Sequence, residues 1–257
     1  AVNTRISLYK IVQKENKTTG TKEIKVFVAE ETLVASKLIN VYEAKNLNPG
    51  SDYRAYVLAD CEYGDTSAYA TIDFTTICDV WTTPYFDGFE NYYFRDLDCW
   101  RTSSSTVSYL PAIDSTKSVN GKKSLKFYSA KDKYGYAYTP QFDVEDISTM
   151  AISFFVYSDK TPNSTYSTEL VVGVLTNPAD PSTFTPLHTV APAQVNTWQY
   201  VSVSLKDYEG DAYGNYGKYV AFRAGTADKT TYVWIDDVTL DKIGCFAPQL
   251  PVINKIT

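Results

Sequence analysis

Residues that could carry nucleophilic or metal-dependent catalysis are scarce in this sequence. It holds one His, one Met and four Cys, which leaves little for His-rich metal sites, Cys–His nucleophiles or zinc ribbons. His188 follows Pro186 and Leu187, and no Ser, Asp or Cys partner motif stands beside it. We therefore expect His188 at the surface or on a strand edge rather than as a general base.

Two carboxylates could hydrolyse a glycosidic bond if they lay about 5–10 Å apart across a sugar-sized cleft. Nothing in the spacing of the 30 Asp and Glu residues singles out such a pair. The sequence therefore predicts a protein that is not an enzyme.

Tyrosine is the residue type most in excess, at 22 of 257 positions, alongside 12 Phe and 4 Trp. Tyr134, Tyr136 and Tyr138 alternate, so on a strand their rings would share one face. Exposed rings stack on the faces of sugars and would make a carbohydrate-binding module, whereas ordinary packing would place the same rings in a core or at an edge.

A second tyrosine group lies in a stretch rich in Gly, Asp and Asn. Its members are Tyr208, Tyr213, Tyr216 and Tyr219. Because a loop has no core to fill, this group is the better candidate for a glycan platform. We name Tyr208, Tyr213 and Tyr216 as its ligand-binding residues.

Composition and charge narrow the class of protein further. The chain is 44% hydrophobic and 21% charged, so it can bury a core. A net charge of −6 and a pI of about 4.9 argue against a nucleic-acid partner. No stretch approaches the roughly 18 uninterrupted apolar residues of a membrane-spanning helix, so we expect no membrane insertion in this segment.

Short alternating segments with many β-branched and aromatic residues recur along the chain. Most are bounded by Gly, Pro, Asn, Asp or Ser, and no window shows a helical period. The segments are 6–12, 24–28, 53–58, 124–128, 151–157, 170–175, 200–205, 219–222 and 232–240. We predict an all-β protein built from sandwiches, with 177–186 as an excursion between strands that has room for one helical turn.

Breaks in this pattern near 77–84 and 242–251 each place a Cys ahead of a Pro and predict tandem modules. In the first module, the sequence LNPGSDYRAYV at 47–57 predicts a turn followed by a strand that begins at Tyr53. The sequence FTT at 74–76 ends this module. These motifs resemble those of a fibronectin type III domain. In that family such a Tyr is buried, and its hydroxyl forms a hydrogen bond with the nearby backbone. By that resemblance 1–77 lacks the first strands, and 245–257 opens a following domain of the same kind, so we expect a piece of a longer array.

An ordered set of short motifs follows between these joints. They are PYFDGFE (84–90), DCW (98–100), NGKKSL (120–125), YTPQF (138–142), VGVLTNP (172–178), GKYVAFR (217–223) and WIDDVTL (234–240). The set resembles the cleaved-adhesin, or choice-of-anchor J, jelly rolls of Bacteroidota-type surface and secreted proteins, which are similar in shape to MAM domains. The resemblance assigns 78–244 to this family and implies adhesion or ligand binding rather than catalysis.

The same resemblance implies a structural calcium ion where the first and last strands of the jelly roll meet. Glu90 and Asp236 stand at the family's positions, and Asp87 is close by. Neighbouring strand residues point to opposite faces, so Asp237 should not join Asp236 as a direct ligand. Calcium takes six to eight oxygens, and we expect backbone carbonyls near Gly121 to complete the shell.

The four cysteines contain no CxxC motif, which fits an oxidising compartment better than a metal site. Three pairings are possible. By the resemblance to repeating modules, Cys61 and Cys245 pair with partners outside this chain, which leaves a Cys78–Cys99 disulfide. We expect an extracellular or cell-surface protein.

Asp114-Ser115-Thr116 matches a short Bacteroidota O-glycosylation pattern and makes Ser115 a candidate glycosylation site.

Three functions fit these observations. The leading hypothesis is a non-catalytic segment of a secreted or cell-surface adhesin that binds a glycan or a host or matrix protein and contacts neighbouring modules of its own polypeptide. The alternatives are a carbohydrate-binding accessory module of a secreted hydrolase and a purely structural stalk. An exposed aromatic platform favours the carbohydrate-binding module, and a bare polar surface with rigid contacts between modules favours the stalk.

Overall fold

The computed structural model describes residues 3–16, 20–33, 42–61, 64–211 and 214–244. In these ranges the regular elements are strands and short 3₁₀ turns, and the strands form three sheets. The predicted all-β class is confirmed. Within the same ranges, no helix is long and apolar enough to cross a membrane.

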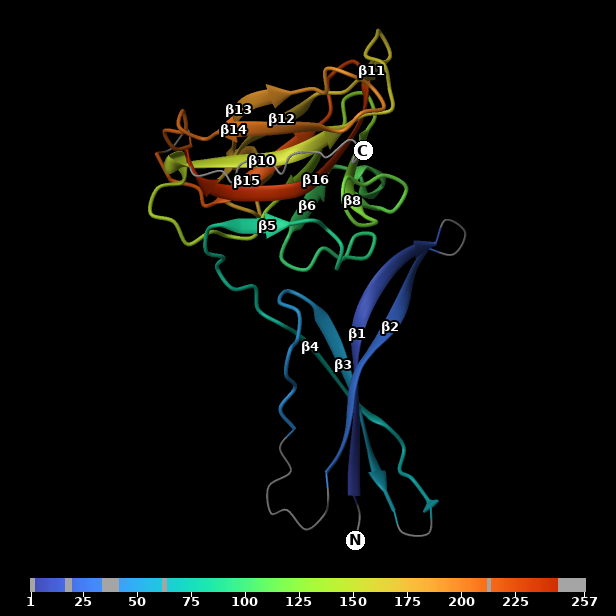
Figure 1. Ribbon diagram of the computed structural model, residues 1–257. Coiled ribbons are helices and arrows are strands. Elements are labelled where there is room, and N and C mark those ends of the chain that lie inside the picture. Colours follow the sequence, from blue (N-terminus) through green and yellow to red (C-terminus); the bar gives the residue numbers. More distant parts are fainter. Residues whose placement is uncertain (1–2, 17–19, 34–41, 62–63, 212–213, 245–257) are drawn as a thin grey trace, which may run out of the picture.

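The first sheet has four antiparallel strands in the order β2-β1-β3-β4 and lies below the rest of the molecule in Figure 1. Its strands are β1 (Asn3–Asn16), β2 (Gly20–Leu33), β3 (Asp52–Asp60) and β4 (Ala70–Thr75). Ile6, Leu8 and Tyr53 lie buried on one of its faces. The Tyr53 hydroxyl accepts a hydrogen bond from the Asn48 backbone amide at 2.8 Å, the arrangement expected of a tyrosine corner.

The remaining strands form two sheets that enclose the main core. The first sheet of this pair runs β14 (Gln199–Ser204), β10 (Met150–Tyr157), β16 (Thr230–Lys242), β8 (Ser124–Ser129) and β7 (Ala112–Asp114), with β11 (Tyr166–Ser167) and β5 (Tyr85–Asp87) also paired to β16. The second runs β13 (Phe184–Val190), β12 (Leu170–Leu175), β15 (Tyr219–Ala224), β9 (Gly135–Tyr138) and β6 (Arg101–Ser104). Phe127, Phe154 and Phe222 are among the fully buried side chains between them.

Eight of the nine alternating segments expected from the sequence fall within strands of the structure, and the ninth, 200–205, extends one residue beyond β14. The expectation for 177–186 is only partly correct. A 3₁₀ turn does occupy Pro181–Thr183, but β13 begins at Phe184 and continues through Pro186. Proline is tolerated because β13 is an edge strand and its register with β12 shifts beside Pro186.

Candidate functional site

The loop 117–123 brings the predicted calcium residues Glu90 and Asp236 to one place. Glu90 Oε1 accepts from the amides of Lys122 and Lys123 at 2.9 and 2.8 Å. Asp236 Oδ2 accepts from the Val119 amide at 2.8 Å. Gly121 has a φ of +69°, and a Cβ there would lie 2.4 Å from the Glu90 carboxyl carbon. The loop can close over Glu90 because this position has no side chain.

The electrostatics of this place suit a cation. Burial raises the pKa of Asp236 to about 7, and the charges of Asp237 and Glu90 raise it too, against amide hydrogen bonds that lower it. In the described part of the chain, none of these three carboxylates forms an ion pair with Lys or Arg. Oxygen donors with uncompensated negative charge are what calcium binds. No three His, Cys, Asp or Glu side chains in the described ranges could hold a metal by themselves, so backbone carbonyls would have to complete the shell.

Asp87 does not belong to this set, which corrects the prediction. Its Oδ2 accepts from the Tyr85 and Tyr92 hydroxyls at 2.9 and 2.5 Å and from the Trp100 indole at 2.9 Å. Its Oδ1 accepts from the Phe89 amide at 2.8 Å. Both oxygens are occupied inside the module. Burial and the Asp87 charge also raise the pKa values of Tyr85 and Tyr92, so both phenols stay protonated as donors.

The predicted platform around Tyr208 is wrong where the structure describes it. Tyr208 is only 3% exposed and belongs to the main core. Its hydroxyl accepts from the Gly217 amide at 2.8 Å. A ring in the core cannot stack on a sugar. Tyr216 is 64% exposed and meets Tyr208 edge-on, and Tyr213 lies outside the described residues.

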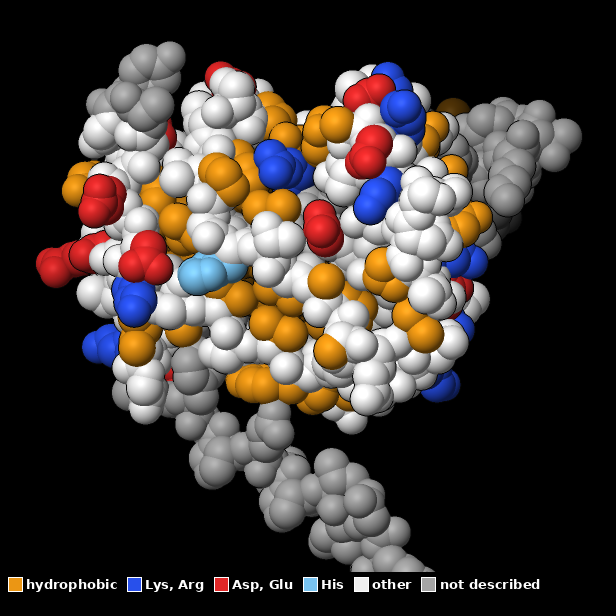
Figure 2. All heavy atoms as spheres, turned by 90° about the horizontal axis from the view of Figure 1, so that it is seen from above, with side chains coloured by type: hydrophobic (Ala, Val, Ile, Leu, Met, Phe, Trp, Pro, Cys, Tyr) orange, Lys and Arg blue, Asp and Glu red, His pale blue; other side chains and the backbone are white. Residues whose placement is uncertain are grey.

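His188 lies on the edge strand β13, as the sequence predicts. Its Nε2 is 3.0 Å from the carbonyl oxygen of Ser204 on β14, so the ring links the edges of the two sheets. The chain's single histidine is pale blue in Figure 2, with hydrophobic side chains and charges of both signs around it. The contact gives His188 a structural role.

Aromatic side chains gather instead on the outer side of the five-stranded sheet. In β15, Val220, Phe222 and Ala224 enter the main core, so Tyr219, Ala221 and Arg223 point to the opposite side. Register then sets their neighbours. On β9, Tyr138 lies opposite Ala221 and Arg101, and Tyr136 lies opposite Arg223. On β12, Leu175 lies opposite Tyr219 and Phe184. We call these side chains the outer face.

The outer face has a small apolar cluster of its own. Tyr138, Leu175 and Ala221 are buried there under Tyr136, Phe184 and Tyr219, which remain partly exposed. The Tyr138 hydroxyl donates to the Pro178 carbonyl at 2.9 Å, and the Tyr219 hydroxyl donates to Gln141 Oε1 at 3.1 Å. Of the tyrosines that alternate along 134–138, Tyr138 therefore packs while Tyr136 still presents a ring to solvent.

Two arginines accompany these rings. The Arg223 guanidinium lies 5.5 Å from the ring centroids of both Tyr134 and Phe184, and its Nε is covered without a hydrogen-bond acceptor. Arg101 is exposed at the other end of the face. It lines a cavity of about 400 Å³. The linker segment that follows β4 forms one part of the cavity wall, and Pro140, Gln141, Pro178 and Tyr219 form another. The structure therefore combines partly exposed rings, cationic donors and a hollow.

Four residues of the outer face were not predicted as site residues from the sequence, although Tyr219 belongs to the second tyrosine group: Arg101, Phe184, Tyr219 and Arg223. Strand alternation carried a signal for β15, because positions 219 and 223 share a face once Phe222 is placed inside. No comparable signal marked Phe184, since β13 itself was not expected.

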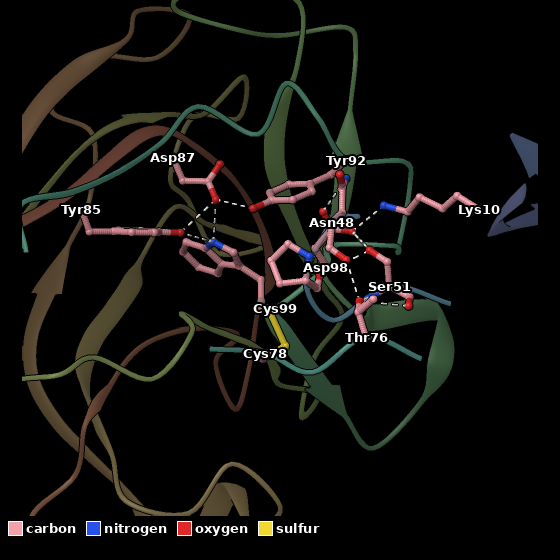
Figure 3. The surroundings of a disulfide bond; sticks show 12 residues. Lys10, Asn48, Ser51, Thr76, Cys78, Tyr85, Asp87, Tyr92, Asp98 and Cys99 are labelled. Atoms are coloured by element: carbon pink, nitrogen blue, oxygen red, sulfur yellow. Dashed lines mark hydrogen bonds and ion pairs between the residues drawn. A yellow bond between two sulfur atoms is a disulfide. The ribbon is translucent and has the colours of Figure 1, made fainter. Parts of the chain in front are cut away.

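The joint between the first sheet and the jelly roll is built around Asp98 (Figure 3). Its Oδ1 accepts from Lys10 Nζ at 2.6 Å and Ser51 Oγ at 2.7 Å, and its Oδ2 accepts from Asn48 Nδ2 at 3.1 Å. Gly50 completes the contact, since a Cβ there would lie 2.9 Å from the Asp98 backbone. All three donors come from the first module, so this acid fixes the two modules to each other.

A disulfide joins Cys78 to Cys99 beside this joint, with 5.6 Å between the Cα atoms. This is the pairing that the family resemblance predicts. Cys61 is exposed and free in the structure, and Cys245 lies outside the described residues. The bond ties the linker to the residue that follows Asp98.

Ser115 is exposed in the turn after β7. Asp114 Oδ1 accepts from the amide and hydroxyl of Thr116, which fixes the turn. Glycosylation of Ser115 remains a prediction.

Neither the models of known protein families nor the sequences of curated proteins match this chain. Among solved structures, it is similar to the K1 cleaved adhesin domain of Lys-gingipain from Porphyromonas gingivalis W83, at 18% identity and a TM-score of 0.47, covering 63% of this chain and 99% of that one. It is similar to the C-terminal family 22 carbohydrate-binding module of Clostridium thermocellum Xyn10B, at 16% identity and a TM-score of 0.40, covering 64% and 95%. It is also similar to a family 11 carbohydrate-binding module from Clostridium thermocellum in complex with a β-1,3-1,4-mixed-linked tetrasaccharide, at 16% identity and a TM-score of 0.39, covering 61% and 93%. Identities and TM-scores this low assign no function to the chain.

Proposed function

We propose that 78–244 form a non-catalytic, glycan-binding module of a modular extracellular or cell-surface adhesin. The outer face carries the proposal, because Tyr136, Phe184 and Tyr219 remain partly exposed there beside Arg101 and Arg223. Sugar rings offer apolar faces edged by hydroxyl groups, and rings with nearby polar donors match both features. The same face would serve an accessory module of a secreted hydrolase.

The disulfide supports the proposed location, since such bonds persist in oxidising compartments. We keep the fibronectin type III assignment of 1–77 within the proposal, and the buried Tyr53 ring with its hydroxyl on backbone supports it. The Asp98 joint favours a second role as a stalk. The two roles are compatible, because a first module fixed to the second would hold the outer face in a constant orientation.

A structural calcium ion is part of the proposal. Glu90 and Asp236 would hold it, together with backbone carbonyls of the loop 117–123. When bound, the ion would neutralise carboxylates that otherwise repel one another. Its role would be to clamp the loop to β16 rather than to react.

Binding of glycans by the full chain tests the proposal. A glycan array should identify ligands, and calorimetry with the strongest should show that Tyr136→Ala and Tyr219→Ala each weaken binding about tenfold or more, as truncation of a central aromatic contact does. Tyr216→Ala is the matched control and should bind like wild type, because Tyr216 lies off the outer face. Failure of every glycan on the array, or full binding by Tyr136→Ala, would contradict the proposal.

A further inference from the structure

The two arginines of the outer face differ from Arg5 and Arg54, each of which forms an ion pair with an aspartate. Arg5 pairs with Asp60 at 3.1 Å and Arg54 with Asp73 at 2.6 Å. In the described part of the chain, neither Arg101 nor Arg223 has a carboxylate partner. The protein has 30 acidic residues against 24 Lys and Arg, so acidic partners are plentiful elsewhere in the chain.

Arg223 is held in place without an anion. The rings of Tyr134 and Phe184 flank its guanidinium, and Tyr136 lies opposite it in the register. Its Nε–H lacks an acceptor in a covered position, which costs free energy, and a ligand would have to bind the other N–H groups of the guanidinium. The side chain as a whole is still partly exposed, so a ligand can reach the guanidinium.

Arg101 offers a second cationic donor beside the cavity. Gln141 turns its Oε1 toward the Tyr219 hydroxyl, which leaves its amide N–H groups as donors. The linker contributes Asp79 to the cavity wall, and this residue is exposed. Arg101 and Arg223 stand two strands apart and two residues apart along the strands. Strand geometry makes that separation about 10 Å across and about 7 Å along.

We propose that the outer face selects glycans with carboxylate groups, that is, oligosaccharides containing uronic acids, with Arg101 and Arg223 binding carboxylates of different sugar residues. This inference rests on the proposed glycan-binding function. The planar guanidinium fork matches the two oxygens of a carboxylate, and the neighbouring rings would contact the sugar faces. Neutral sugars would leave both arginines without an anion.

The test uses the full chain with oligogalacturonate, oligomannuronate and hyaluronan fragments, each compared with its own carboxyl-reduced, neutral form. We expect at least one acidic ligand to bind at least tenfold more tightly than its neutral form, and its affinity to fall as salt is added. Arg223→Gln and Arg101→Gln should each weaken binding of the acidic ligand about tenfold, and each should weaken binding of the neutral form by a clearly smaller factor. Arg223→Lys should weaken it as well, because lysine keeps the charge but lacks the fork.

Lys206→Gln provides a matched control, since it removes one exposed positive charge in the turn after β14, away from the outer face. Unchanged melting temperatures would show that each variant folds. Equal affinity for an acidic ligand and its neutral form, or binding of sulfated glycans alone, overturns the preference for carboxylates while leaving glycan binding in place. Absence of binding to any acidic or neutral glycan rejects both this inference and the proposed function.

Discussion

Tyr208 and Tyr136 carry the same side chain, and their surroundings decide what each can do. Tyr208 has its hydroxyl on the Gly217 amide inside the core, so its ring stabilises the fold. Tyr136 stands on the outer side of a sheet whose inner side is already filled. Exposure therefore separates Tyr136, which we propose to contact a glycan, from Tyr208, which packs in the core.

Replacement of Tyr208 by Phe tests this distinction. The variant keeps the ring but leaves the buried Gly217 amide without its acceptor, so we expect the free energy of unfolding to fall by about 1–3 kcal/mol. Chemical denaturation measures the change, and glycan affinity should not move. Tyr216→Phe should stay within about 0.5 kcal/mol of wild type, as exposed substitutions do. A Tyr208→Phe variant that lost glycan binding without losing stability would restore Tyr208 to the site.

At the scale of elements, the loop 117–123 makes β16 and the segment after β5 interdependent. Its amides bond Glu90 on one side and Asp236 on the other. The loop therefore depends on two carboxylates that repel each other when no cation is present.

Calcium removal should destabilise the jelly roll through this loop. An ion at a hundredfold excess over its dissociation constant stabilises the folded state by about 2.7 kcal/mol, which corresponds to about 5–10 °C in melting temperature for a domain of this size. We expect a chelator to lower the melting temperature by that amount and calcium to restore it.

Asp236→Asn should abolish the response to the chelator. Asp87→Asn serves as the control, because it should lower the melting temperature equally with and without calcium. If the chelator changes nothing in the wild type, the proposed site is wrong.

The strands could be predicted from the sequence because their signal is local. Alternation within 151–157 or 232–240 is visible without knowledge of any partner strand. β13 was not predicted because Pro186 interrupts its alternating pattern. A proline is acceptable in this strand only because the strand lies at the edge of its sheet. The outer face could not be predicted from the sequence for a related reason. Arg101 and Arg223 come together through the registers of two strand pairs, and no spacing in the chain encodes those registers.

The joint around Asp98 connects the two parts of the molecule, the first sheet and the jelly roll. Lys10 and Asp98 are 88 residues apart in sequence, and no motif relates them. Both side chains are nearly covered, at 7% and 9% exposed. A buried pair of this kind makes the loss of one partner costly, because the other charge remains out of water.

Asp98→Ala should uncouple the two modules. We expect a loss of about 1.5–3 kcal/mol from the joint, since Lys10 would lose its 2.6 Å hydrogen bond and keep only Asp96, at 3.8 Å, as a carboxylate partner. Hydrogen exchange should show reduced protection in β1, and small-angle scattering should show a wider range of module orientations. Asp73→Ala, which breaks the more exposed pair with Arg54, should cost under about 1 kcal/mol and leave the orientation unchanged. Equal effects of the two substitutions would mean that Asp98 does not hold the joint.

The Cys78–Cys99 bond also determines how tension would pass along the polypeptide. The two cysteines are 21 residues apart in sequence, a stretch that could extend to about 70 Å when fully drawn out. A pulling force applied through the linker would pass directly from one sulfur to the other and bypass that slack. Glu90 and Asp98 both lie on the bypassed stretch, so the backbone at neither residue would carry the load.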